Sequence, residues 1–90
     1  MESYKAACLS TAHLTPADHR RLDRLQSNMV ICRDTGWFVK LYEEPENNFY
    51  PFMSREFNDI LVKLCHSGYR MVEFDCDGPI SEYFPNFDGE

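Results

Sequence analysis

The sequence predicts a single α+β domain over residues 1–90, with its elements in the order β-α-β-β-α-β. Two segments with helical apolar spacing each follow a Ser or Thr that can cap a helix, and four short apolar runs lie before, between and after them. The simplest packing of this order is a four-stranded antiparallel sheet with both helices on one face, the ferredoxin-like arrangement. A hydrophobic fraction of 43% supplies enough apolar surface for one core.

The first strand and the first helix are predicted near the N-terminus. Residues 4–9 are an apolar run of strand length. Thr15 can cap the helix that follows, and Asp18 occupies the capping-box position three residues later. This helix is expected to extend to about Ser27 and to have a thin apolar face.

The middle of the chain predicts a hairpin and then a loop. Residues 29–32 and 36–42 are the clearest strands, and the short connection that ends at Gly36 is typical of antiparallel neighbours. Residues 43–53 contain two prolines and two asparagines, a composition that predicts a loop. The aromatic residues of this loop are expected to fold back on the core or to form an exposed apolar surface.

A second helix and a last strand complete the predicted domain. Ser54 can cap the helix, and Gly68 is a natural stop for it. Its apolar stripe, at i, i+3, i+4 and i+7, consists of Phe57, Ile60, Leu61 and Leu64. Residues 69–74 predict the fourth strand, and the glycine and prolines beyond it predict an irregular C-terminal end.

The whole net charge of −6 lies in residues 71–90, because residues 1–70 contain nine acidic and nine basic side chains. The acids at this end alternate with apolar and aromatic residues. Aromatic anchors in an acidic field are typical of a contact surface for a basic protein, although the same aromatics could cover the open edge of the sheet. Both interpretations stay open. The candidate partner-binding residues are Asp75, Asp77, Glu82, Tyr83, Phe84 and Asp88.

Composition argues against several other classes of protein. An acidic chain with a pI near 4.9 is not expected to bind nucleic acid through its whole surface, because phosphate contacts need Lys and Arg. No apolar run is long enough to span a membrane, and the first residues lack the pattern of a signal peptide, so we expect a cytoplasmic protein. The spacing of the four cysteines fits neither a zinc site nor a redox motif, and we expect reduced, structural thiols. They are Cys8, Cys32, Cys65 and Cys76.

Three segments, in this order and spacing, resemble a known family. They are Leu-Ser-Thr-Ala-His-Leu-Thr at residues 9–15, Gly-Trp-Phe-Val at residues 36–39 and Asp-Cys-Asp-Gly-Pro at residues 75–79. The combination resembles an uncharacterised family of small bacterial proteins, a domain of unknown function that looks common on plasmids, phages and other mobile elements. The resemblance covers roughly residues 4–88. It implies a compact α+β domain and no known reaction.

Two of these segments contain residue types that are used in catalysis. No G-x-S-x-G nucleophile elbow surrounds Ser10, so Ser10 is expected to satisfy backbone groups and His13 to act as an ordering hydrogen bonder. Residues 75–78 resemble the start of a calcium loop, but the fifth position is a proline and the twelfth is Asn86. We expect an Asx-type turn there. In an antiparallel sheet His13 and Asp75 would lie at opposite ends, too far apart to share a metal or a proton.

The sequence therefore favours a small, acidic, non-enzymatic protein that binds a basic surface of another protein. The family resemblance narrows this hypothesis to an anti-defence inhibitor of a mobile element, similar to an anti-CRISPR, that blocks a basic nucleic-acid-binding surface. Two alternatives stay open. One is a metal-dependent enzyme that uses Asp75, Asp77 and His13. The other is a single-stranded nucleic-acid-binding module that uses Trp37 and Phe38. The favoured hypothesis needs no cofactor.

Overall fold

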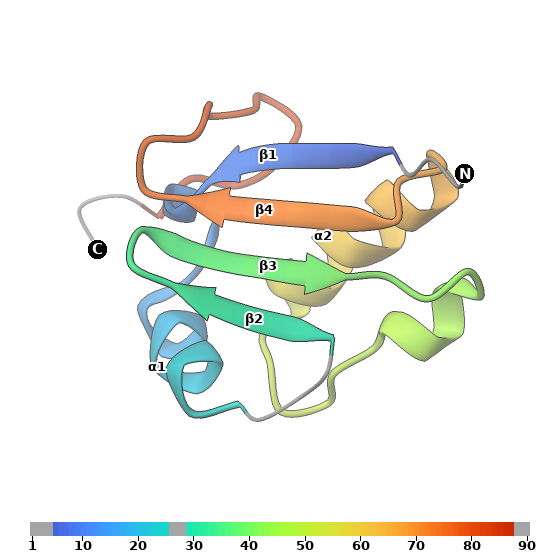
Figure 1. Ribbon diagram of the computed structural model, residues 1–90, viewed down its shortest axis with the longest axis horizontal. Helices are drawn as coiled ribbons and strands as arrows, with labels where there is room; N and C mark the ends of the chain where they lie inside the picture. The colour runs from blue at the N-terminus through green and yellow to red at the C-terminus, as the bar shows by residue number, and fades with distance from the viewer. Residues whose placement is uncertain (1–4, 26–28, 88–90) are drawn as a thin grey trace.

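The computed structural model describes residues 5–25 and 29–87 (Figure 1). The strands in this part of the chain are β1 (Ala6–Ser10), β2 (Val30–Arg33), β3 (Gly36–Lys40) and β4 (Met71–Asp75). The helices are α1 (Pro16–Arg24) and α2 (Arg55–His66), and two short 3-10 helices, η1 (Thr11–His13) and η2 (Pro45–Asn48), follow β1 and β3. The predicted α+β class and the order β-α-β-β-α-β are confirmed.

The four strands form one sheet in the order β1-β4-β3-β2. Strand β3 is antiparallel to both of its neighbours, as predicted, but β1 is parallel to β4. The sheet is therefore mixed, and the prediction of an all-antiparallel sheet was wrong for this one pair. The β1–β4 register places Ala6 opposite Met71 and Ser10 opposite Asp75.

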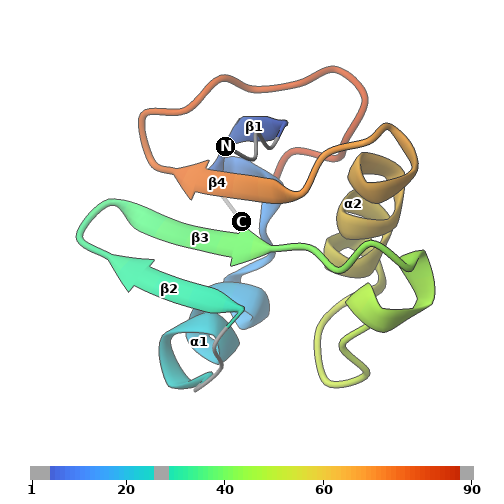
Figure 2. The ribbon, with the colours of Figure 1, turned by 45° about the vertical axis from the view of Figure 1, so that its right-hand side comes forward.

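The connection between β3 and β4 explains the mixed sheet. Residues 41–54, which include η2, carry the chain from the end of β3 back across the molecule to the start of α2 (Figure 2). Helix α2 then returns the chain to the end of the sheet where β3 finished, so Met71 pairs with Lys40 and β4 runs antiparallel to β3. The free edge of β4 accepts β1 in the parallel direction (Figure 1).

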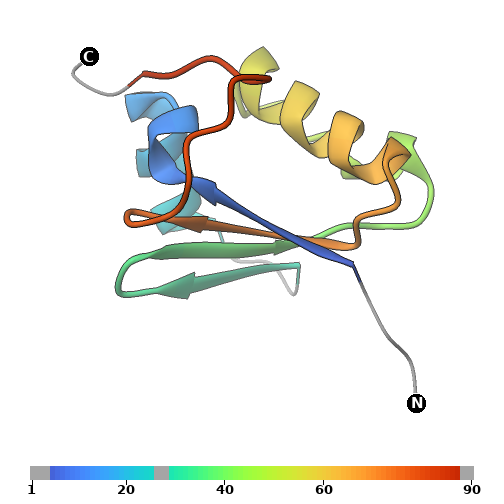
Figure 3. The same ribbon diagram turned by 90° about the horizontal axis from the view of Figure 1, so that it is seen from above.

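Both helices cover one face of the sheet, as predicted (Figure 3). The hydroxyl of Thr15 accepts a hydrogen bond from the backbone N–H of Asp18 at 3.1 Å, and the hydroxyl of Ser54 accepts one from Phe57 at 3.1 Å. These two bonds confirm the predicted helix caps. Helix α1 ends at Arg24, earlier than predicted, and Ser27 lies outside the described residues.

The core lies between the sheet and the two helices. The predicted stripe of α2 is buried against it, and the rings of Phe57 and Phe74 lie 6.0 Å apart. From the sheet, alternate residues such as Val39 and Val72 point into the same layer and are fully buried. Burial of each such side chain contributes about 1.5–3 kcal/mol to the free energy of folding. This layer therefore stabilises the packing of the two helices on the sheet.

The long loop after β3 is ordered by two buried asparagines. Asn48 bonds the backbone N–H and C=O of Tyr42, and Asn58 of α2 bonds both backbone groups of Tyr50. The ring of Tyr50 packs against the core, while Phe49 and Phe52 are exposed. The loop aromatics were expected either to fold back on the core or to form an exposed apolar surface. Tyr50 does the first, and Phe49 and Phe52 do the second.

All four cysteines are free thiols. Cys8, Cys32 and Cys65 lie in apolar runs of the kind that hold buried thiols, but only Cys65 is buried. Cys8 alternates along β1 with the buried Leu9, and Cys32 lies on the edge strand β2, so both are exposed. An apolar run in a strand has two faces, and only one of them packs on this core.

No helix in the described ranges is both long enough and apolar enough to cross a membrane.

Candidate functional site

The parallel pairing of β1 and β4 brings the three family segments together at one end of the sheet. Ser10 lies opposite Asp75, and Asp75 also lies opposite Gly36. The turns that follow β1 and β4 and the turn between β2 and β3 therefore meet at this end (Figure 1). The expectation that His13 and Asp75 lie at opposite ends was wrong, because it assumed antiparallel pairing.

Asp75 organises the turn after β4. One carboxylate oxygen accepts a hydrogen bond from the backbone N–H of Asp77 at 2.8 Å, and the other accepts one from the hydroxyl of Thr35 at 3.0 Å. The guanidinium of Arg33 lies 3.9 Å from the second oxygen. These contacts lower the pKa of Asp75, the N–H of Asp77 being the largest cause and the Thr35 hydroxyl the next. The expected Asx-type turn is therefore present.

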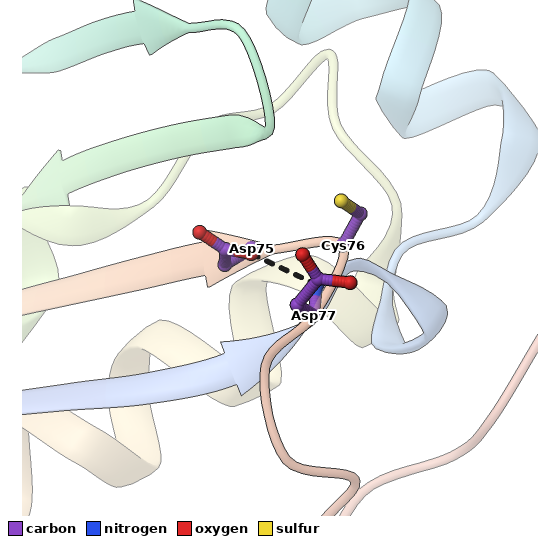
Figure 4. Close-up of side chains that lie close together, drawn as sticks. All are labelled: Asp75, Cys76 and Asp77. Atoms are coloured by element: carbon purple, nitrogen blue, oxygen red, sulfur yellow. Dashed lines mark hydrogen bonds between the residues drawn. The ribbon is translucent and has the colours of Figure 1, made fainter.

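The only group of possible metal ligands in the described ranges is on the same turn (Figure 4). Asp75, Cys76 and Asp77 can each offer one ligand atom, and these atoms lie within 4.8 Å of one another. Cys76 and Asp77 are exposed. Both oxygens of Asp75, however, already accept hydrogen bonds that hold the turn and join it to the β2–β3 turn. The geometry of Asp75 is thus explained by its structural contacts.

The two glycines of the family segments allow close backbone packing at this end. A Cβ atom on Gly36 would lie 1.7 Å from the carbonyl oxygen of Phe74 in β4. A Cβ atom on Gly78 would lie 2.7 Å from the carbonyl oxygen of Leu9 in β1. Both distances are far below van der Waals contact, so the segments need glycine at these positions for packing, independently of any chemistry.

His13 is fully buried and joins η1 to the end of the chain. Its Nδ1 lies 2.7 Å from the carbonyl oxygen of Pro85, and its Nε2 accepts a hydrogen bond from the backbone N–H of Ser81 at 2.9 Å. The ring also packs edge-on against Phe84, with 5.9 Å between centroids. His13 is therefore the ordering hydrogen bonder that the sequence suggested, and both of its nitrogens are occupied by backbone groups.

Residues 76–87, called here the C-terminal segment, have no regular secondary structure but are attached at several points. Besides the two bonds to His13, the N–H of Ser10 donates to Pro79 at 2.8 Å, and the N–H of Phe87 donates to Ala12 at 2.7 Å. The segment passes around the outside of β1 and then reaches the helix layer (Figures 2 and 3). Its bond to Ser10 covers the C-terminal end of the β1 edge, while Ala6 and Cys8 stay exposed, so edge closure, one of the two expected roles, applies to part of this edge.

The structure separates the six predicted partner-binding residues into different environments. Phe84 is half-buried, packs against the core and has the Lys63 ammonium 5.8 Å from its ring centroid. Asp75 is held in the turn described above. Asp77 and Glu82 are exposed, and Tyr83 is 85% exposed. Asp88 lies outside the described residues.

Ile80 belongs with the exposed residues, although the sequence did not single it out as a contact residue. It is 56% exposed and lies between Asp77 and Glu82 in the segment. The four exposed side chains Asp77, Ile80, Glu82 and Tyr83 are called here the C-terminal surface. Two of them, Asp77 and Ile80, line a cleft of about 740 Å³ together with Ser10, Thr11, Arg20 and Cys76, whereas Tyr83 lines a different cleft.

The aromatic residues proposed for stacking on nucleic-acid bases are not available as a set. Trp37 is only 6% exposed, and its indole N–H has no hydrogen-bond acceptor within the described part of the chain. It packs edge-on against His19, whose Nε2 donates to the carbonyl oxygen of Thr11. Phe38 follows Trp37 in β3 and therefore points to the opposite face of the sheet. The alternative of a single-stranded nucleic-acid-binding module therefore lacks the exposed Trp37 ring that base stacking needs.

Sequence reasoning missed the buried carboxylate of Asp18. It is not exposed at all, and its oxygens accept hydrogen bonds from the backbone N–H and the hydroxyl of Ser54, the cap of α2. Arg21 lies 3.7 Å from it. The capping-box position already accounted for an acid there, so no sequence pattern indicated a link between the two helices.

These features define a small α+β domain in which a buried histidine fixes an acidic, aromatic C-terminal segment beside a four-stranded mixed sheet. A family model described as the C-terminal domain of a family of unknown function, DUF5983, matches residues 6–89. The chain belongs to this family, and the resemblance to an uncharacterised family is confirmed. No curated protein and no solved structure matches the chain.

Proposed function

We propose that this domain works by binding a protein with a basic surface, without catalysing a reaction, and that the C-terminal surface makes the contact. One observation carries the proposal. The C-terminal segment has a fixed backbone, yet it leaves Tyr83 85% exposed and Ile80 56% exposed beside two exposed acids. Large apolar side chains held outward on an ordered segment are typical of interaction sites.

Ordering and charge both support binding at this surface. The hydrogen bonds to Ser10, Ala12 and His13 fix the segment before a partner arrives, so little conformational entropy remains to be lost on association. Residues 76–87 contain no Lys or Arg, and Asp77 and Glu82 make the surface acidic. An acidic surface of this kind attracts basic partners and accelerates their association.

In its narrower form, the proposal is that the domain acts in the cytoplasm as an anti-defence inhibitor of a mobile element, similar to an anti-CRISPR. Such a protein would cover a basic surface that a defence protein uses to hold nucleic acid. The net charge of −6 supports this form, because acids on a protein can replace phosphates as partners for Lys and Arg. Direct binding of nucleic acid by the domain is not expected for the same reason.

The test compares two charge reversals that change the net charge equally. Asp77→Lys/Glu82→Lys changes the C-terminal surface, and Glu43→Lys/Glu46→Lys changes exposed acids in the loop after β3. Each protein is used to capture partners from the native host, and binding of the captured protein is then measured at several salt concentrations. We expect the first pair to slow association at least several-fold and to weaken its salt dependence, with the second pair close to wild type. Equal behaviour of the two pairs would contradict the proposal.

Calorimetry separates this proposal from a metal-dependent enzyme. Titration with Mg²⁺, Mn²⁺, Ca²⁺ and Zn²⁺ is expected to show no stoichiometric binding, because the oxygens of Asp75 are engaged in the turn. Stoichiometric binding that disappears in Asp75→Asn would favour the enzyme instead.

A further inference from the structure

We infer that His13 is a pH-dependent latch for the C-terminal segment, which holds the segment when its ring is neutral and releases it when the ring is protonated. The latch is a property of the fold and needs no partner. Its consequence for binding, the regulation of the C-terminal surface, rests on the proposed function.

The hydrogen bonds of His13 assign its protonation state. A carbonyl oxygen can only accept, so Nδ1 must donate to Pro85 and carries a proton. A backbone N–H can only donate, so Nε2 must accept from Ser81 and carries none. The ring is therefore neutral in the latched state, with its proton on Nδ1. No other protonation state satisfies both contacts.

Protonation of Nε2 would place two donors against each other. The N–H of Ser81 is 2.9 Å from Nε2, and the His13 ring is fully buried, so a proton added to Nε2 would have no solvent contact. A buried charge without an acceptor is costly, and the contact must open. The contact between Nε2 and Ser81 is therefore lost whenever the ring takes up a second proton.

The charged groups around His13 do not offset the added proton through a hydrogen bond. The titratable or charged side chains on the elements around it include Asp18, His19 and Arg20 of α1, Lys63 of α2, Glu73 and Asp75 of β4, and Cys76, Asp77, Glu82 and Tyr83 of the segment. Asp18 is bonded to Ser54, and Asp75 to Thr35. Lys63 lies against Phe84 and opposes a second positive charge nearby. Asp77 and Glu82 are exposed to solvent, which screens them.

Opening of this contact would detach a defined part of the chain. His13 holds the segment at Ser81 and Pro85, between the bonds that Pro79 and Phe87 make to β1 and η1. Phe84, which packs on the His13 ring, would lose its site as well. The segment would then leave the β1 edge, and the C-terminal surface would lose its fixed geometry.

His19 provides a matched control within the same chain. Its Nε2 donates to the carbonyl oxygen of Thr11 at 3.1 Å, and this bond is kept when the ring is protonated. Acid should therefore leave His19 in place. His13→Asn keeps a donor for Pro85 but cannot be protonated, so it should remove the pH response of the segment, whereas His19→Asn should not.

Nitrogen NMR of the wild-type histidines, combined with amide hydrogen exchange, tests the latch without a partner. At pH 7.5 we expect His13 to carry its proton on Nδ1 and His19 on Nε2. Between pH 7.5 and pH 5, exchange at Ser81 and Phe87, corrected for the intrinsic pH effect, should rise at least tenfold. Exchange at Val39 and Val72 in the sheet should not change. The rise should persist in His19→Asn and be absent in His13→Asn.

Three results would overturn the latch. They are a proton on Nε2 of His13 at pH 7.5, a charged His13 with unchanged exchange at Ser81, and a His13 that stays neutral down to pH 4 with the segment attached. Each is read from the wild-type protein, so the test stands even if a variant does not fold. Because no partner takes part, a failed latch is distinguishable from a failed binding proposal.

Discussion

Asp18→Ala is expected to destabilise the domain more than the replacement of any other single acidic residue in α1 or α2 by alanine. The Asp18 carboxylate is fully buried and accepts hydrogen bonds from both the backbone N–H and the hydroxyl of Ser54, which connects the start of α1 to the start of α2. Without this carboxylate, the N–H of Ser54 loses its acceptor. The side chain thus fixes the position of one helix relative to the other.

The structure sets the size of this effect. A hydrogen bond to a charged group contributes about 1.5–3 kcal/mol, so the loss of two of them lowers the free energy of unfolding by about 3–6 kcal/mol. That is a large part of the roughly 5–15 kcal/mol that holds a small domain together. Asp18→Asn keeps one acceptor oxygen and should lose about half as much. Asp59→Ala is the control, because its pair with Arg55 is exposed and contributes below about 1 kcal/mol.

Urea denaturation at pH 7, followed by circular dichroism, measures these differences. A double-mutant cycle of Asp18→Ala with Ser54→Ala should show a coupling of about 0.5–3 kcal/mol, because the two side chains share a hydrogen bond. A loss below about 1 kcal/mol for Asp18→Ala, within the range of an exposed ion pair, would refute this reasoning. So would additive effects of the two substitutions.

Two further substitutions test the end of the sheet where the family segments meet. Gly78→Ala places a Cβ atom 2.7 Å from the carbonyl oxygen of Leu9 and should lower the free energy of unfolding by about 1–3 kcal/mol in urea, whereas a neutral result would show that this turn packs differently. Asp75 has a lowered pKa in the folded protein, so its contribution to stability is present above the ordinary carboxyl value of about 3.9 and is lost as the pH falls through the lowered value. Asp75→Asn should therefore destabilise the domain at pH 7 and much less at pH 2, and an equal loss at both pH values would contradict the assignment.

Local signals in the sequence predicted the elements well. Thr15 and Ser54 cap the helices because their side chains bond the backbone three residues later, and this contact depends only on neighbouring residues. The apolar stripe of α2 is buried for a similarly simple reason, its helical spacing. The order of the elements and the α+β fold class were predicted correctly from them.

The direction of β1 relative to β4 could not be predicted in the same way. A strand has the same alternation of buried residues whether its neighbour is parallel or antiparallel. The direction depends on the path of residues 41–54, which is set by the buried amides of Asn48 and Asn58. The residues around each asparagine do not predict that its side chain orders this loop.

The candidate site could be predicted only in part, because some of its contacts likewise depend on residues that are distant in the sequence. Acids and aromatics at the C-terminal end were visible in the sequence, and Tyr83 is 85% exposed. Their role as contact residues stays a prediction. The partners of His13 were not visible, because they are the backbone groups of Ser81 and Pro85, which any residue could supply. Phe84 was placed among the contact residues, but its ring packs inward beside that histidine.

Site-specific photo-crosslinking tests the binding proposal most directly. A photoreactive phenylalanine analogue is placed at Tyr83, which is 85% exposed on the C-terminal surface, or at Phe49, which is 59% exposed in the loop after β3. After irradiation in the native host, crosslinked proteins are identified by mass spectrometry. We predict that position 83 captures a specific protein with a basic surface and that position 49 does not. Capture from position 49 with none from position 83 would contradict the proposal that the C-terminal surface is the contact.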